Sequence, residues 1–444
     1  MNKRSAINKD RLSQLPQPIL HNILSLLSQR DAVQTSLLSK SWRYLWHGRL
    51  NVEFRDIDYP FDKKEEIWPF IDKTLQRYLY QNLSLQKFLV DIRSVAVDFA
   101  LLRKWIPVLL MNMGVRSLNL LFRMNNIAFP LPLVVFQSES LVELHLQRCD
   151  LSILESTDNV MLNNLQTLRL HDVYITDEIF EKIISGCPLM ENMDLLECIG
   201  LKSIKLHKHY NIITLRTLRI ENCCDNWFLR HKNMHFPHLK SLKKATEGFF
   251  FDTPNILYFE YSCDGDAVLP SIKFTTTSNV WKSKISLSYK LDRLDKDFLK
   301  LNTLLKALSQ SHITLELVYN EYQKLHIDDS YGGFYKPVVV EHLKLRGFFS
   351  SSFDPVIPNC FFRICRPLYI HMDLYGDVHA KCIVVEYISK LILDEAGPDL
   401  EKVSIEVWDE KAEEWHFVKG TSFPALRFKQ LIRFLLTWKE RDKN

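Results

Sequence analysis

The sequence contains little glycine and none of the glycine-rich loops that hold phosphates. Only 12 of its 444 residues are glycine, and neither a Walker loop nor a G-x-G-x-x-G turn is found. A G-x-S-x-G elbow and an H-E-x-x-H helix are also absent. The sequence therefore lacks the motifs of the common nucleotide-binding enzymes, serine hydrolases and zinc proteases. We expect a non-catalytic protein without a cofactor.

Long apolar runs are missing as well. The N-terminus, MNKRSAINKD, has no apolar core and is not a secretory signal, and no apolar run approaches the length that crosses a bilayer. The nine cysteines are odd in number and scattered, which is typical of reduced thiols rather than a disulfide framework. We expect a protein of the nucleus or cytoplasm, or both, that does not act in a membrane.

Neither charge nor metal-ligand spacing indicates a further ligand. The net charge of +4 is spread along the chain, whereas nucleic-acid binding favours a clustered basic stripe. One metal-like cluster consists of Cys223, Cys224, His231 and His235, with His238 nearby. Adjacent cysteines match no standard zinc spacing, so we interpret Cys223 as a core residue and expect no metal.

The N-terminal stretch, residues 10–46, is rich in apolar residues but too short to bury them against itself. Leu15-Pro16 predicts the start of a helix, whose apolar stripe comprises Ile19, Leu20, Ile23, Leu24 and Leu27. Asp31 with Gln34 predicts a capped second helix through Leu38. Ser39 can begin a short third helix that carries Trp42, Leu45 and Trp46 and ends at Gly48.

A repeat follows this stretch. Residues 141–151, 165–175, 190–198 and 215–223 fit the pattern L-x-x-L-x-L-x-x-C-x-L, and residues 115–120 are a weaker copy. Its central positions are 26, 24, 25, 25 and 24 residues apart: Leu118, Leu144, Leu168, Met193, Leu218 and Leu242. This period predicts an α/β fold, a curved leucine-rich-repeat solenoid with parallel strands on its concave face and helices on its convex face.

The pattern also predicts further elements outside the regular repeats. Strands are expected at 50–54, 85–90, 256–261, 313–317, 340–345 and 400–405, and helices at 65–80, 99–111, 177–188, 297–308 and 381–393. The repeats, each of which would form one rung of the solenoid, become irregular in length after about residue 243. The apolar face of residues 423–438 predicts a C-terminal cap helix.

The middle residue of each L-x-L strand should point away from the core. These outward positions, where solenoids usually bind partners, are Asn119, His145, Arg169, Asp194, Lys205 and Arg219. Arg169, Lys205 and Arg219 would favour an acidic or phosphorylated segment. The alternative is a solvated face without selectivity.

The N-terminal stretch resembles a known motif. D-R-L-S-x-L-P-x-x-I-L-x-x-I-L-S-x-L at 10–27 and D-A-V-x-T-S-x-L-S-K-x-W-R-Y-L-W at 31–46 resemble the F-box of plant F-box/leucine-rich-repeat proteins. The resemblance implies an F-box at residues 1–49 and a solenoid at 50–444. It also implies a substrate receptor of an SCF ubiquitin ligase, in which the F-box binds a Skp-type adaptor and, through it, a cullin, while the repeats bind a protein substrate.

The resemblance implies that apolar residues of this segment bind the adaptor, although some of them must pack inside the three-helix piece. The candidates are Leu12, Leu15, Pro16, Ile19, Leu20, Ile23, Leu24, Val33, Leu37, Leu38, Trp42, Leu45 and Trp46. Three alternatives stay open: an ordinary helical cap on a solenoid, a repeat scaffold outside ubiquitination, and a small-molecule receptor on the same frame.

Overall fold

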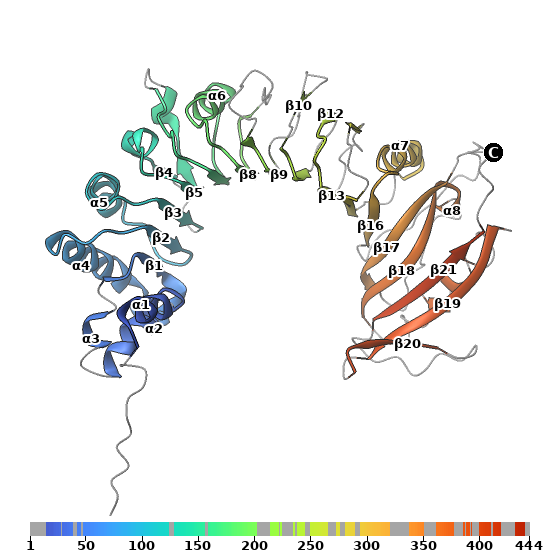
Figure 1. Cartoon of the computed structure of the whole chain (residues 1–444), viewed down its shortest axis with the longest axis horizontal. Helices are drawn as coiled ribbons and strands as arrows, with labels where there is room; N and C mark the ends of the chain where they lie inside the picture. The colour runs from blue at the N-terminus through green and yellow to red at the C-terminus, as the bar shows by residue number, and fades with distance from the viewer. Residues whose placement is uncertain are drawn as a thin grey trace, which may run out of the picture. The chain divides into compact units, whose positions relative to one another are not determined.

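The chain forms two compact units in a computed structural model (Figure 1). The N-terminal unit comprises Met1–Leu215 and Asn222–Asp225, and the C-terminal unit comprises Arg216–Glu221 and Asn226–Asn444. The structure describes residues 15–27, 29–38, 42–45, 48–123, 128–155, 159–201, 214–221, 223, 234–235, 238–244, 249–264, 272–275, 280–288, 294–319, 337–349, 361–376, 385–386, 388–390, 392, 399–409, 412–418 and 431–439. Within these ranges, no helix has the length and apolar character needed to span a bilayer.

Short helices open the N-terminal unit: α1 (Gln17–Ser25), α2 (Gln29–Gln34), the 3₁₀ turn η1 (Thr35–Leu37) and α3 (Trp42–Leu45). Pro16 occupies the N-cap of α1 in an extended conformation, as predicted from the Leu15-Pro16 pair. The predicted cap at Asp31 is wrong, because α2 begins two residues earlier. Asp31 lies in the first turn of α2 instead, where its negative charge interacts favourably with the helix dipole.

Arg49 connects these helices to the first repeat. Its guanidinium Nη2 donates a hydrogen bond to the carbonyl oxygen of Leu27 at 2.7 Å, and its own carbonyl accepts one from the Tyr78 hydroxyl at 2.8 Å. Tyr78 lies in α4 (Ile67–Tyr80). Arg49 is 4% exposed, and burial lowers the pKa of its guanidinium. The domain boundary at residue 49 therefore coincides with a buried contact, although the boundary itself stays a prediction.

The repeats of the N-terminal unit form a parallel sheet whose strand order is the chain order. Its strands are β1 (Asn51–Arg55), β2 (Lys87–Ile92), β3 (Ser117–Phe122), β5 (Glu143–Gln147), β7 (Thr167–His171) and β8 (Asn192–Leu196). Leu118, Leu144, Leu168 and Met193 lie opposite one another in register and are buried. The predicted period and its parallel strands are confirmed here.

Helices cover the other side of these strands (Figure 1). They are α4, α5 (Phe99–Met111), η5 (Leu133–Gln137), η6 (Ser152–Glu155) and α6 (Asp177–Ser185). Pro107 lies inside α5 without shortening it. Gly186 caps α6, and a Cβ there would lie only 2.4 Å from the carbonyl oxygen of Val160. A small β4–β6 pair (Phe129–Pro130, Cys149–Asp150) adds to this side.

The cysteines of the repeats are core residues. Cys149, Cys198 and Cys223 are buried, and the backbone N–H of Cys198 donates to the Cys223 sulfur at 3.4 Å. Burial raises the pKa of the Cys149 thiol. This agrees with the interpretation of Cys223 as a core residue. Cys224 and His231 lie outside the described residues.

The C-terminal unit continues with longer parallel strands. They are β9 (Thr217–Glu221), β11 (Ser241–Lys244), β13 (Tyr258–Asp264), β15 (Lys282–Ser288), β16 (His312–Tyr319), β17 (Val338–Phe349) and β18 (Cys365–Gly376). A separate parallel sheet contains β10 (Met234–His235), β12 (Phe249–Asp252) and β14 (Ile272–Thr275). The described helices are α7 (Leu294–Ala307), α8 (Phe361–Ile364) and the helical positions between 385 and 392.

The C-terminal end of this sheet corrects the sequence prediction. β18 is followed in space by β21 (Ile432–Trp438), β19 (Leu400–Asp409) and β20 (Glu414–Phe417), all paired antiparallel. The predicted cap helix is wrong over 432–438. Ile432, Phe434 and Leu436 are buried while their neighbours are not, a period of two that belongs to a strand.

We expect Leu168→Ala to destabilise the N-terminal unit strongly. Leu168 is 1% exposed, and removing a buried leucine typically costs about 2–5 kcal/mol through lost transfer energy and a cavity. Leu189→Ala is the matched control, because Leu189 is 44% exposed and should change stability by no more than about 0.5 kcal/mol. Urea denaturation measures both, and equal midpoints for the two variants would contradict the rung packing.

Candidate functional site

The apolar candidates of the N-terminal helices divide into a buried and an exposed set. Leu20, Leu24 and Trp42 form a small core with Ala32. Leu15, Ile23, Leu27 and Leu45 pack against this core from its edge. These residues hold the helices together, so their side chains offer a partner little surface. Leu12 and Trp46 lie outside the described residues.

The exposed set lies at the helix ends. Leu37 is 86% exposed, Leu38 63% and Ile19 45%, while Pro16 is exposed and Val33 half-buried. We define the apolar docking patch as Pro16, Ile19, Leu26, Leu37 and Leu38. Large apolar side chains that stay exposed on a folded domain are candidates for contact with a partner.

Leu26 was missed by the sequence reasoning, although it is 87% exposed at the C-cap of α1. It lies beside the apolar stripe of that helix rather than on it. An apolar residue next to a complete stripe has no core position to fill, and this is the signal that could have identified Leu26.

The outward positions of the N-terminal sheet form a row across neighbouring strands. His145, Arg169 and Asp194 lie opposite one another in register, and Arg169 Nε donates to Asp194 Oδ2 at 3.1 Å. Lys205 lies outside the described residues. Arg219 belongs to the C-terminal unit and makes two hydrogen bonds of 2.7 Å to the carboxylate of Glu221. The described arginines of this prediction are therefore paired with carboxylates.

Asn119 does not present the exposed side chain that the alternation predicted. It is only 8% exposed and donates a hydrogen bond from its amide nitrogen to Ser117 Oγ at 3.0 Å. In register it lies between Leu89 and His145, whose side chains are larger than that of asparagine. A short side chain in such a row is covered by its neighbours.

A second outward cluster, in the C-terminal unit, was missed by the sequence reasoning. Histidines 342 and 371 share a hydrogen bond of 3.0 Å between Nδ1 and Nε2. The His342 ring lies 5.2 Å from that of Tyr369, and the Arg433 guanidinium lies 4.1 Å from the Trp415 ring centroid. Burial lowers the pKa of His371 to about 4, with further contributions from the positive charges around it. These residues come from β17, β18, β20 and β21, and no repeat period connects them in the sequence.

A charged ladder lies on five neighbouring strands of the same unit, β13, β15, β16, β17 and β18. Lys284 Nζ is 3.2 Å from a Glu260 oxygen and 3.0 Å from a Glu316 oxygen. Arg346 bonds Glu316 at 2.7 Å and Asp373 at 3.0 Å. Burial of Glu316 opposes its ionisation, but hydrogen bonds from Arg346 and Lys284 outweigh this and lower its pKa to about 2. Each cation of the ladder bridges two carboxylates on the neighbouring strands, and these ion pairs connect strands β13 to β18.

Among the described residues, no group of histidines, cysteines and carboxylates is arranged to hold a metal ion. Of the metal-like cluster noted in the sequence, Cys223 is buried and His238 is exposed. The candidate sites are therefore surfaces: the apolar docking patch on the N-terminal helices, and the rows of outward-facing side chains on the sheets. Together, the fold and these surfaces define a leucine-rich-repeat protein whose N-terminal helices carry exposed apolar residues.

Comparison with known proteins identifies an F-box and a leucine-rich-repeat region in the chain. Residues 12–52 match the F-box domain, and residues 102–211 match the family described as FBD-associated F-box protein At5g56370, LRR repeats. The chain is similar to F-box/LRR-repeat protein At3g59200 of Arabidopsis thaliana, with 31% identity over 281 residues that cover 61% of this chain and 49% of the relative. The chain therefore resembles the plant F-box/leucine-rich-repeat proteins in its F-box and in its repeat region.

Further relatives from Arabidopsis thaliana carry the same pair of segments in their names. Putative F-box/LRR-repeat protein At5g41840 is 27% identical over 335 residues, covering 70% of this chain and 61% of the relative. Putative F-box/LRR-repeat protein At3g59160 is 30% identical over 323 residues, covering 65% and 64%. The chain thus spans about half to two thirds of the length of these curated relatives.

We expect His145 to make stability depend on pH. Burial, with the positive charges of Arg169 and His171, lowers the pKa of His145 to about 4 against the opposing charge of Asp91, whereas an unfolded histidine titrates near about 6.5. As the pH falls from 6.5 towards 4, the unfolded chain binds a proton that the folded chain does not. The stability present above pH 6.5 is therefore lost over this window.

Thermal unfolding between pH 7 and pH 5 measures this effect. The melting temperature of His145→Gln should fall less steeply with decreasing pH than that of the unmodified chain. His238→Gln is the control, because His238 is exposed in a turn and should leave the slope unchanged. Identical slopes for all three proteins would show that His145 does not carry this dependence.

Proposed function

We propose that this protein is the substrate-recognition subunit of an SCF-type ubiquitin ligase. Its F-box would bind a Skp-type adaptor and, through it, a cullin, while the repeats bind a protein substrate. The protein would do no covalent chemistry; it would contribute proximity and orientation to the reaction of its partners. The proposal places its action in the nucleus or cytoplasm.

The observation that carries this proposal is the apolar docking patch. The F-box helices have a core of only a few side chains, and Leu26, Leu37 and Leu38 remain outside it. Covering such side chains contributes about 25 cal/mol per Å² of apolar surface, so a partner subunit would gain stability by seating on them. The F-box match makes a Skp-type adaptor the partner of choice.

The substrate side of the proposal follows from the outward rows. Arg169 is paired with Asp194 and Arg219 with Glu221, which weakens the expectation that these arginines select an acidic or phosphorylated segment. Aromatic and histidine side chains are better placed in the C-terminal unit, where Tyr369, His371 and Trp415 share one face. Partly exposed aromatic residues beside an arginine are frequent anchors of protein interfaces.

Replacing Leu37 and Leu38 together by serine should weaken binding of the adaptor strongly. Both side chains are mostly exposed, so the folded chain should keep its stability while the interface loses apolar anchors. Hot-spot residues contribute at least about 2 kcal/mol, equivalent to a loss of affinity of roughly thirtyfold. Surface-immobilised adaptor with purified chain measures this change.

Met111→Ser is the control, because Met111 is 73% exposed but lies outside the F-box helices. Its affinity for the adaptor should equal that of the unmodified chain. The Leu15→Ala and Pro16→Ala pair is a less specific test, because Leu15 packs against the helical core. Unchanged adaptor binding by the double serine variant would contradict the proposal.

Membership in a ligase also predicts which cellular partners accumulate. Proximity labelling with the unmodified chain should identify proteins whose labelling increases when the proteasome is inhibited. The double serine variant should label the same proteins without that dependence on inhibition, since it would hold substrates but not deliver them. A scaffold outside ubiquitination would label one set of proteins with either chain, whether or not the proteasome is active.

A further inference from the structure

A row of outward side chains crosses the C-terminal end of the sheet, within the C-terminal unit. Lys344 of β17 lies opposite His371 of β18, which in turn lies opposite Arg433 of β21. His342 adjoins them, with its Nδ1 3.0 Å from Nε2 of His371. All four side chains are half-buried. We define these four residues as the histidine row, which brings nitrogen atoms of three strands together on one face.

Arg433 is the fixed cation of this row. It forms an ion pair with the buried carboxylate of Glu406 on β19. Its guanidinium lies 4.1 Å from the ring centroid of Trp415 and 5.6 Å from that of Tyr369. These contacts hold the guanidinium in place before any partner arrives, and an ordered site loses less entropy on binding.

Lys344 is the cation of the row that remains available. Within the described part of the chain it forms no ion pair, although Glu316 lies opposite it on β16. The two carboxylate oxygens of Glu316 already contact Lys284 at 3.0 Å and Arg346 at 2.7 Å. The Lys344 ammonium can therefore approach an anionic group without giving up an existing ion pair.

The charges around the two histidines favour an anion on this face. Burial is the largest cause of the low pKa of His371, about 4, and the charges of the partner ring, Lys344 and Arg433 contribute. The same two cations lower the pKa of His342, after burial and against the opposing charge of Glu341. The remaining charged groups nearby are Lys282, and carboxylates that each contact another group: Glu406 with Arg433, Glu316 with Lys284 and Arg346, Asp373 with Arg346, and Glu341 with His312.

The hydrogen-bonded histidine pair can hold one additional proton. While both rings are neutral, one of the two bonded nitrogens donates and the other accepts. When His371 is protonated, both of its nitrogens are donors, so Nε2 donates to Nδ1 of a neutral His342 and Nδ1 of His371 becomes available to an anion. A charge-assisted hydrogen bond is roughly twice as strong as a neutral one, so a bound anion would raise the pKa of His371.

We propose that the histidine row binds an anionic side chain in a segment of a protein substrate, and that His371 takes up a proton as the anion binds. The anion would lie near the Lys344 ammonium and the His371 ring, and the apolar part of the segment against Tyr369 and Trp415. This inference rests on the proposed function, because it names the chemical class of the substrate. A carboxylate and a phosphate group both supply the required charge, and the experiment distinguishes them.

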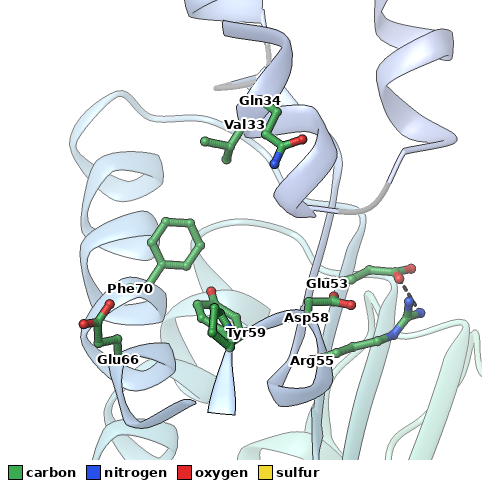
Figure 2. A pocket seen from close by; sticks show the side chains of 9 residues that line it. Val33, Gln34, Glu53, Arg55, Asp58, Tyr59, Glu66 and Phe70 are labelled. Carbon is green, nitrogen blue, oxygen red and sulfur yellow. Dashed lines mark hydrogen bonds and ion pairs between the residues drawn. The ribbon is translucent and has the colours of Figure 1, made fainter. Parts of the chain in front are cut away.

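A cavity of about 270 Å³ beside the F-box helices is a poorer site for the same ligand (Figure 2). Its lining includes the carboxylates of Glu53, Asp58 and Glu66, and the guanidinium of Arg55. Figure 2 shows that this guanidinium is paired with Glu53, at 2.6 Å. Carboxylates thus outnumber cations in this lining and would repel an anion. We therefore expect anionic segments to bind at the histidine row and not at this cavity.

Immobilised peptide pools test the proposal with the full-length chain. Each pool has one fixed central residue between mixed flanking residues, and the fixed residue is glutamate, glutamine, phosphoserine or serine. We expect a glutamate or phosphoserine pool to bind the chain about fivefold more tightly than its neutral counterpart, because the anion gains charge-assisted hydrogen bonds. The anionic pool with the higher affinity identifies the chemical group. Equal binding by anionic and neutral pools would overturn the proposal.

Matched variants locate the site. Lys344→Gln removes the available cation and should weaken binding of the anionic pool about threefold or more. Lys240→Gln is the control, because Lys240 is an exposed lysine of the same unit that precedes β11, several strands away from β17. It should leave binding unchanged. Equal losses in both variants would indicate a diffuse charge effect and overturn the assignment.

The pH dependence tests the proton. A glutamate side chain titrates near about 4.3, so it stays ionised while affinity for the glutamate pool is measured from pH 7.5 down to 5.5. Affinity should rise about threefold or more over this range, since one proton taken up contributes up to about tenfold per pH unit. His371→Gln should remove this rise, whereas His416→Gln should keep it, because His416 is exposed on β20. Constant affinity of the unmodified chain would overturn the proposal.

Adaptor capture separates this inference from the ligase assignment. The histidine row lies in the C-terminal unit, whereas the apolar docking patch lies in the N-terminal unit, so Lys344→Gln should capture the adaptor as well as the unmodified chain does. Normal adaptor capture without a preference for anionic pools would overturn this inference alone. A clear preference for anionic pools without adaptor capture would overturn the ligase assignment alone.

Discussion

Each strand of the repeat region can bury its leucines only when the next strand lies in register beside it. Leu144 is covered because Leu118 and Leu168 flank it on neighbouring strands, and the same holds along each row. A rung has no core of its own, so the stack must begin and end on something else. In this protein the F-box begins it through the buried contacts of Arg49, and antiparallel strands close the C-terminal end.

This dependence on neighbours separates the two kinds of apolar residue in the chain. The leucines of the repeats are buried within the chain, because each repeat is covered by the next one. The F-box helices are too few to repeat, and their small core around Leu24 and Trp42 leaves Leu26, Leu37 and Leu38 exposed. The proposed adaptor would supply the cover that a further rung supplies elsewhere.

On the outward faces of the sheets, charged and polar side chains form ion pairs and hydrogen bonds with one another. Carboxylates and cations alternate across the strands, as in the Glu260, Lys284, Glu316 and Arg346 ladder. Such pairs fix the register and leave little net charge to select a partner. Selectivity is therefore better sought where this pairing gives way to rings, at Tyr369 and Trp415 in the C-terminal unit.

The sequence alone predicts the repeat, the N-terminal helices and the F-box motif, because a period of about 25 residues and an ordered motif depend only on the order of residues in the chain. It could not divide the F-box leucines into core and surface, since a helical stripe does not say which side Trp42 will cover. It also predicted a helix where β21 lies. Short apolar runs are compatible with the period of a helix and with that of a strand, and only the pairing with neighbouring strands distinguishes the two. Asn119 and the His342–His371 pair were decided only by tertiary structure, which brings together side chains from strands far apart in the chain and lets large neighbours cover small ones.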